Sequence, residues 1–176
     1  LGLCKLLLHR EVNYEAALEL AGSAAADSTR VNMLVRDVAG GDLKKLGLPG
    51  DVEAAFFGKL LSGMPDSATD ADIVVSLLEM IAQNIAQLAQ LNARVHSAQR
   101  IIFTGSFLRR NTILRTKIVQ QLRGWGRIGG FGEPMSAIFL KHEGYCGAVG
   151  ALLETVGCPG AQFYRSAQAV AGHNAP

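Results

Sequence analysis

One long apolar repeat constrains this chain more than any other feature of its sequence. Between positions 70 and 96, apolar residues recur at intervals of three and four, which is the spacing of one face of an α-helix. The members of this repeat are Val74, Leu77, Leu78, Ile81, Ile85 and Leu88. Thr69 followed by Asp72 predicts a capping box at the start. At ~1.5 Å per residue the helix is roughly 35–40 Å long, and we expect it to form the spine of a domain or a seam between two copies of the chain.

The region after this helix alternates between two patterns. A β-branched run at 99–105 and a second short apolar run at 136–140 predict buried strands. A helical pattern at 111–125 lies between them, with Asn111 as its predicted N-cap and Gly124 near its end. The Gly-rich stretch 124–135 predicts a loop, and the Gly- and Ala-rich segment 142–156 predicts a helix packed tightly on the sheet. Strand–helix–strand–helix order favours an α/β domain with at least partly parallel strands.

The first seventy residues give a less regular pattern. We expect helices at 1–8, at 13–22 with Asn13 as N-cap, and at 27–38 with Asp27 or Ser28 as N-cap. The Gly-, Pro- and Asp-rich stretch 39–51 predicts a loop. Residues 52–58 fit either a short strand or a buried turn of helix, and the pattern does not decide between them.

Length, net charge, hydropathy and cysteine content narrow the classes of protein to which this chain could belong. The 176 residues suffice for one ordinary domain, and a net charge of +2 does not favour nucleic acid or an anionic membrane as a partner. No uninterrupted apolar run reaches the roughly 18–20 residues that span a bilayer. Cys4, Cys146 and Cys158 lack disulfide-framework spacing, so we expect reduced thiols in an intracellular protein. The chain opens on a helical pattern without Met, which suggests a fragment of a longer protein.

The stretch "RIIFTGSFLRRN" at 100–111 is the strongest candidate for a binding site. In α/β sheets ligands bind beyond the carboxyl ends of the strands. Gly105 follows such a strand and, lacking a Cβ, lets a flat ligand approach the backbone. This geometry suits a nucleotide. A single Gly after a strand is a weak signal, however, and a simple tight turn is the more frequent outcome of this pattern alone.

Five segments, in order, resemble the eukaryotic-type (type II) pantothenate kinases over roughly residues 1–153. They are "LVRDVAGGDLKKLGLPG", "FFGK", "LLEMIAQNIAQLAQLNA", "IIFTGSFLRRN" and "FLKHEGYCGAVGALL". The resemblance implies half of an actin-like ATPase and sugar-kinase fold, with a mixed sheet flanked by helices. It implies phosphorylation of pantothenate by Mg-ATP, a homodimer, inhibition by acyl-CoA and a cytosolic location. The family's phosphate loop and catalytic glutamate lie upstream of the segment resembling 1–8, so the chain alone is expected to be inactive.

The resemblance also assigns residues to the nucleotide. The turn formed by Thr104, Gly105, Ser106 and Phe107 corresponds to the nucleotide side of the family's cleft. Ser106 stands where catalytic members usually carry Asn, which shortens the hydrogen-bonding group. Mg²⁺ is expected to arrive with ATP, because no cluster of His, Cys, Asp and Glu has metal-ligand spacing.

Other positions are assigned structural, interface or regulatory roles. Trp125 and Gln121 correspond to residues beside the family's acyl-CoA channel. Gln121 replaces a small residue there, and the Gly-rich connection that follows is longer than in the family, so both departures weigh against the usual inhibition by acyl-CoA. Either Arg109 or Arg110 could balance the charge of phosphates, or both could be solvated. Arg109 matches a family arginine, which favours a structural or interface role, and Arg110 is expected to be solvated. Asn84 matches an asparagine of a family motif and lies among apolar neighbours, so it is expected to be a buried or interface amide, with contact to a ligand as the alternative. The same structural class includes His142, Glu143 and Tyr145 of the "HEGY" motif.

Besides the active pantothenate kinase, which is the first hypothesis, two others stay open. Parts of the 72–96 segment resemble the branch fused to a phosphatase domain, some members of which lack the catalytic glutamate. A catalytically inactive kinase-like protein or dimerisation module is therefore the second hypothesis. A kinase of the same superfamily acting on a sugar is the third, weaker one.

We expect residues 1–157 to form one subdomain and 158–176 to be a loose tail.

Overall fold

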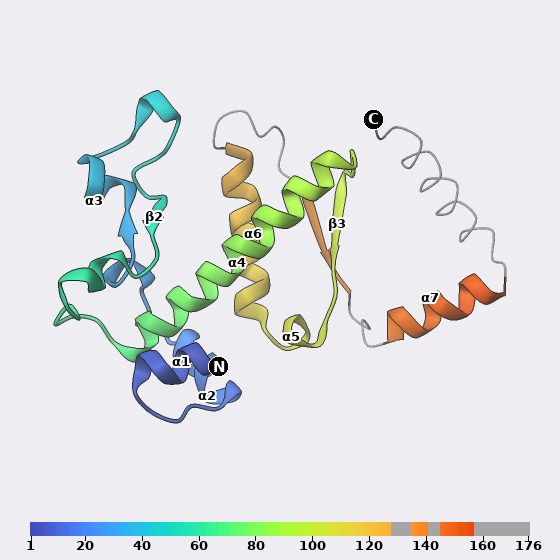
Figure 1. Cartoon of the computed structure of the whole chain (residues 1–176), viewed down its shortest axis with the longest axis horizontal. Helices are drawn as coiled ribbons and strands as arrows, with labels where there is room; N and C mark the ends of the chain where they lie inside the picture. Colours follow the sequence, from blue (N-terminus) through green and yellow to red (C-terminus); the bar gives the residue numbers. More distant parts are fainter. Residues whose placement is uncertain (128–134, 141–144, 157–176) are drawn as a thin grey trace.

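The structure is a computed structural model that describes residues 1–127, 135–140 and 145–156, without the side chains of residues 125–127, 146 and 154. Its elements follow one another along the chain as shown in Figure 1. They are α1 (Gly2–Leu8), α2 (Tyr14–Ala21), η1 (Ser28–Arg30), β1 (Met33–Leu34), α3 (Val35–Ala39), η2 (Lys44–Leu46), β2 (Glu53–Ala55), η3 (Gly58–Ser62), α4 (Asp70–Val95), β3 (Arg100–Phe103), α5 (Ser106–Arg109), α6 (Thr112–Arg127), β4 (Ser136–Phe139) and α7 (Cys146–Thr155).

Helix α4 is the spine that the apolar repeat predicts. It runs for 26 residues between the amino-terminal elements and the β3–α6 region (Figure 1). The predicted capping box is present, because the Thr69 side chain accepts from the Asp72 N–H and the Asp72 carboxylate accepts from the Thr69 N–H. By length and hydropathy α4 is the one described helix that could cross a membrane, but 61% of its most apolar window is buried inside the protein. Such burial is what a core helix shows.

Two apolar clusters lie along α4. Its first half packs against α1 and α2 through residues such as Val74, Leu77 and Leu78. Its second half packs against α6 and β3 through the small residues Ala82 and Ala86, both fully buried. Leu114, Ile118 and Leu122 of α6 complete this second cluster. One helix thus serves both cores.

The strands form two separate two-stranded sheets among the described residues. Strands β3 and β4 pair in parallel, which confirms the prediction from strand–helix–strand order. Strands β1 and β2 pair antiparallel, so residues 53–55 adopt the strand alternative for that region. The mixed α/β class and the long helix are confirmed, whereas the expected single mixed sheet is divided into an antiparallel and a parallel pair.

The single helix expected at 27–38 is wrong. The structure has η1, β1 and α3 in its place, although Asp27 does act as an N-cap by accepting from the Thr29 N–H. Tertiary hydrogen bonds account for the difference, because the N–H groups of Val35 and Arg36 donate to the carbonyls of Val52 and Gly50. Pairing with the 50–55 segment thus replaces the local helical bonds that the sequence pattern favoured.

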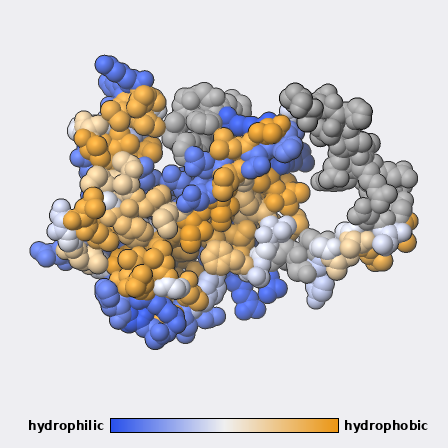
Figure 2. All heavy atoms as spheres, in the orientation of Figure 1, coloured by the Kyte–Doolittle hydropathy of each residue, from blue (hydrophilic) through white to orange (hydrophobic). Residues whose placement is uncertain are grey.

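The expected packing of α7 on the sheet is also wrong. The helix exists, but Figure 1 shows it apart from β3, and its apolar residues Val149, Leu152 and Leu153 are exposed, as is Val156 just after it. Figure 2 shows apolar surface on this helix as well as over the amino-terminal helices. Small residues permit close packing but supply no partner by themselves, so composition alone did not determine where α7 lies.

Candidate nucleotide-binding turn

The candidate site begins where β3 ends. Strands β3 and β4 are in register from Arg100 opposite Ser136 to Phe103 opposite Phe139, so their carboxyl ends share one edge. The rings of Phe103 and Phe139 stack there with centroids 5.3 Å apart and an interplanar angle of 18°. This stack fixes the base from which the next residues, the 104–107 turn, emerge.

The 104–107 turn presents bare backbone to solvent. All four of its residues are exposed, and Gly105 has φ 130° and ψ 150°, a conformation that L side chains rarely adopt. A Cβ built at Gly105 would meet no atom within 4 Å. Glycine is therefore required by the backbone angle and not by crowding, and open space lies in front of the turn for a ligand.

Asn111 ends this segment and begins α6. Its Oδ1 accepts from the Leu114 N–H at 2.8 Å, which confirms the predicted N-cap. Asn111 is fully buried, and its Nδ2 has no hydrogen-bond acceptor among the residues that the structure describes. The amide therefore acts within the fold and is not offered to a ligand on the surface.

Arginines follow the turn closely. Arg109 and Arg110 are exposed, and the carbonyl of Arg109 accepts from Nη2 of Arg115 at 2.8 Å. A cavity of about 10 Å³, lined partly by Gly105 and Arg109, lies between the strand ends and these residues. It has room for about one water molecule. A nucleotide would therefore lie against the outer surface of the turn.

The expectation of a buried amide at Asn84 is wrong. Asn84 lies on the exposed side of α4, and its Nδ2 donates to the carbonyl of Met80 one helical turn earlier, at 2.8 Å. Farther along the same side, Leu88, Leu91 and Val95 expose 62%, 42% and 79% of their surface. The interface role of Asn84 stays a prediction, and this apolar stripe is where it would apply.

The remaining predicted residues do not gather at the turn. Gln121 is half-buried on α6, and Trp125 lies on the same helix, but its side chain falls outside what the structure describes. His142, Glu143, most of the Gly-rich loop and the tail lie outside the described residues, whereas Tyr145 is 74% exposed. Within the described ranges, no group of three or more His, Cys, Asp or Glu side chains has the arrangement of a metal site.

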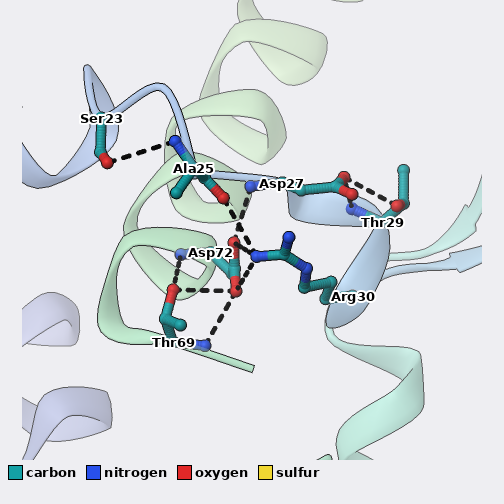
Figure 3. A network of polar contacts seen from close by, with 7 residues as sticks. All are labelled: Ser23, Ala25, Asp27, Thr29, Arg30, Thr69 and Asp72. Atoms are coloured by element: carbon teal, nitrogen blue, oxygen red, sulfur yellow. Dashed lines mark hydrogen bonds and ion pairs between the residues drawn. The ribbon is translucent and has the colours of Figure 1, made fainter. Parts of the chain in front are cut away.

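The polar network around Asp72 is larger than the sequence predicted (Figure 3). The Asp72 carboxylate is fully buried and accepts from the Asp27 N–H at 2.6 Å, from the Thr69 N–H at 2.8 Å and from Arg30 at 3.3 Å. Burial acts to raise the pKa of Asp72, but these donors together hold it below its usual value. The capping-box pattern in the sequence predicted the contact with Thr69. Asp27 and Arg30 are far from Asp72 in the sequence, and no local pattern indicates their contacts with it.

A second buried charge was also missed. Glu79 of α4 is 6% exposed and forms an ion pair with Lys117 of α6, while its Oε2 has no hydrogen-bond partner among the described residues. Burial raises the pKa of Glu53 on β2, and the charge of Glu79 adds to that rise. The Glu79–Lys117 ion pair joins α4 to α6, and the spacing of each residue on its own helix gave no hint of the other.

Comparison with known proteins supplies the family. A family model described as Fumble matches residues 1–154. The chain belongs to the Fumble family. The Fumble chain is 38% identical over 150 residues to pantothenate kinase 2 of Arabidopsis thaliana and 35% identical over 157 residues to the pantothenate kinase of Schizosaccharomyces pombe. It is 36% identical over 148 residues to the 4'-phosphopantetheine phosphatase of Mus musculus. These relatives confirm the resemblance predicted from the five segments.

The matches cover most of this chain but a minor part of each relative. The Arabidopsis and mouse alignments include 84% of the chain and 16% and 17% of those relatives. The alignment with the yeast kinase includes 87% of the chain and 37% of that relative. Most of the length of each relative thus has no counterpart in the described turn, helices and strands.

Proposed function

We propose that this chain is part of an ATP-dependent pantothenate kinase, which transfers the γ-phosphoryl group of ATP to pantothenate in the first step of coenzyme A synthesis. The observation that carries the proposal is the exposed Gly105 turn at the carboxyl end of β3, in a chain 35–38% identical to pantothenate kinases. A strand end with open backbone is where α/β folds bind ligands. The proposal includes an actin-like arrangement for the intact protein, in which this chain supplies one half.

The 104–107 turn is the nucleotide-side wall in this proposal. Open space at Gly105 admits a flat ligand against the backbone, and Ser106 offers a hydroxyl. Arg109 and Arg110 lie on the surface just beyond, where their charge favours the phosphates of ATP. Phosphoryl transfer depends chiefly on positioning and charge stabilisation. We assign no catalytic base or metal ligand to this chain, and Mg²⁺ would arrive on the phosphates of ATP.

The proposal extends to assembly and regulation. A cytosolic homodimer would bury the exposed stripe of Leu88, Leu91 and Val95 on α4. Gln121 and Trp125 on α6 would lie beside an acyl-CoA channel, although the longer side chain at 121 argues for a weaker response to acyl-CoA than in members with a small residue there.

The same stripe favours a second candidate function, an inactive assembly module of the same family, related to the branch that includes the mouse phosphatase. Leu88→Arg should then convert a dimer into a monomer while leaving the melting temperature of the monomer unchanged, since Leu88 is 62% exposed. Sedimentation velocity measures this directly. A wild-type protein that is monomeric over a wide concentration range would contradict both the module and the dimer.

The decisive test of the kinase is formation of 4'-phosphopantothenate from pantothenate and Mg-ATP by the complete protein. We expect saturable, ATP-dependent product formation. The reaction should be weakened by Gly105→Val and unaffected by Leu46→Ala, since Leu46 is exposed on η2, outside the proposed site. A complete protein that is folded and dimeric but binds no ATP analogue and makes no product would favour the assembly module.

A further inference from the structure

A tyrosine far from the turn in sequence contacts it directly. Tyr14 is the first residue of α2, and its hydroxyl donates to the carbonyl of Phe107 at 3.3 Å. The two rings also contact each other, with centroids 6.0 Å apart and an interplanar angle of 48°. Asn13 caps α2 by accepting from the Ala16 N–H at 2.8 Å, so the backbone that carries Tyr14 is fixed.

The turn needs such a contact because it has little stability of its own. Helix α5 has only four residues, which is less than the length at which a helix persists unaided. Two side chains from other helices hold its backbone carbonyls. Tyr14 of α2 binds the carbonyl of Phe107, and Arg115 of α6 binds the carbonyl of Arg109. The turn is thus pinned from both sides, once near each end of α5.

Leu108 packs α5 against the second apolar cluster, but the neighbouring Phe107 is packed only loosely. Phe107 is 43% exposed and lines a cavity of about 210 Å³ together with Tyr14, Cys4, Leu78 and Ile81. An apolar cavity of about 150 Å³ holds a benzene ring. The Phe107 ring therefore has room to turn inward, and the Tyr14 contact is one of the two side-chain hydrogen bonds that hold the α5 backbone at the position seen in the structure.

We propose that Tyr14 is a positioning residue for the nucleotide, acting through Phe107 to hold the 104–107 turn in its binding geometry. This inference rests on the proposed kinase function. Without the hydroxyl, the turn would sample positions in which its backbone no longer matches the nucleotide, and each binding event would require the turn to be ordered again. The effect should fall on ATP and not on pantothenate.

The test compares Tyr14→Phe with wild type in the complete protein, and Glu15→Gln is the matched control, since Glu15 is exposed on the same helix turn. We expect Tyr14→Phe to speed hydrogen exchange of amides 105–109. The Kd of a non-hydrolysable ATP analogue and the KM for ATP should rise about three- to tenfold, the effect of one hydrogen bond. The melting temperature and the KM for pantothenate should stay unchanged, and the control should match wild type.

Two results would overturn the inference and leave the kinase proposal standing. One is nucleotide binding by Tyr14→Phe that equals wild type, whatever happens to hydrogen exchange. The other is unchanged exchange at amides 105–109 in the variant. If wild type itself binds no ATP analogue, the kinase proposal and this inference both fail. Faster exchange together with an ATP-specific rise in Kd supports the inference.

Discussion

The Asp72 network lies at the start of the long helix α4 and the 104–107 turn follows the short strand β3, and the two regions differ in how their polar groups are satisfied. Asp72 is fully buried, and its carboxylate accepts hydrogen bonds from Asp27 and Thr69 and pairs with Arg30. The turn around Gly105 is exposed, and open space lies in front of it. A cluster whose groups are satisfied internally stabilises the fold, whereas exposed backbone beside arginines is available to a ligand.

The sequence showed part of this difference, because it predicted the contact between Asp72 and Thr69 but not the contacts that Asp72 makes with Asp27 and Arg30. Burial and hydrogen-bond partners separate the two regions. We therefore expect substitutions at Asp72 to change the free energy of unfolding and substitutions in the turn to change ligand binding.

Asp72→Ala should have the largest effect on stability. It removes a buried charge that accepts several hydrogen bonds and leaves the Asp27 and Thr69 N–H groups without their acceptor, at a cost of about 4 kcal/mol in the free energy of unfolding. Urea unfolding measures this. Asp70→Ala is the matched control, because Asp70 makes an exposed ion pair with Arg10 and its loss should cost less than about 1 kcal/mol. Equal costs for both variants would remove the distinction between buried and exposed polar groups.

Lys117→Met should rank second. It leaves Glu79 as a buried charge without its ion-pair partner, and the free energy of unfolding should fall by about 3 kcal/mol. The double variant Glu79→Met with Lys117→Met removes both charges and should recover most of the loss. Chemical denaturation of the three proteins tests this, and a double variant less stable than Lys117→Met would show that the pair is not what joins α4 to α6.

Glu53→Gln should have a smaller effect of opposite sign. Burial raises the pKa of Glu53, so the folded state binds its proton more tightly than the unfolded state. The stability that this proton contributes is present below the unfolded pKa of about 4.3 and is lost as pH rises through the folded pKa. Replacing the carboxyl with a neutral amide should therefore stabilise the protein at pH 7 relative to wild type, and the gain should shrink toward pH 4. Thermal unfolding across this range would contradict the assignment if the gain grew on acidification.

Asn84→Ala should have the smallest effect. Its side chain is exposed and bonds only the Met80 carbonyl, so the unfolding free energy of the monomer should change by less than about 0.5 kcal/mol. A loss above 2 kcal/mol at protein concentrations where only the monomer is present would restore the buried amide that the sequence suggested.

Much of the fold follows from local chemistry that the sequence displays. The α4 capping box, the Asn13 and Asn111 caps and the two parallel strands were all predictable, because each depends on neighbouring residues or on strand order. The structure of residues 27–38 was not predictable, because backbone N–H groups of this segment donate to carbonyls of the 50–55 segment. The exposure of Asn84 and the path of α7 depend on which surfaces are covered, and composition does not encode that. At the site, the Gly105 turn was visible in the sequence, but the contact from Tyr14, 93 positions away from Phe107, was not.

Calorimetric titration of the complete protein with a non-hydrolysable ATP analogue tests the central claim most directly. Gly105→Val should weaken binding at least tenfold by filling the open space at the turn, and should also cost about 1–3 kcal/mol of stability through its backbone angle. Gly63→Val is the matched control, since Gly63 has φ 102°, open space around its Cβ position and a place in a different loop. It should lose similar stability and bind the analogue like wild type. A folded Gly105→Val protein with wild-type affinity would show that the turn is not the wall of a nucleotide site.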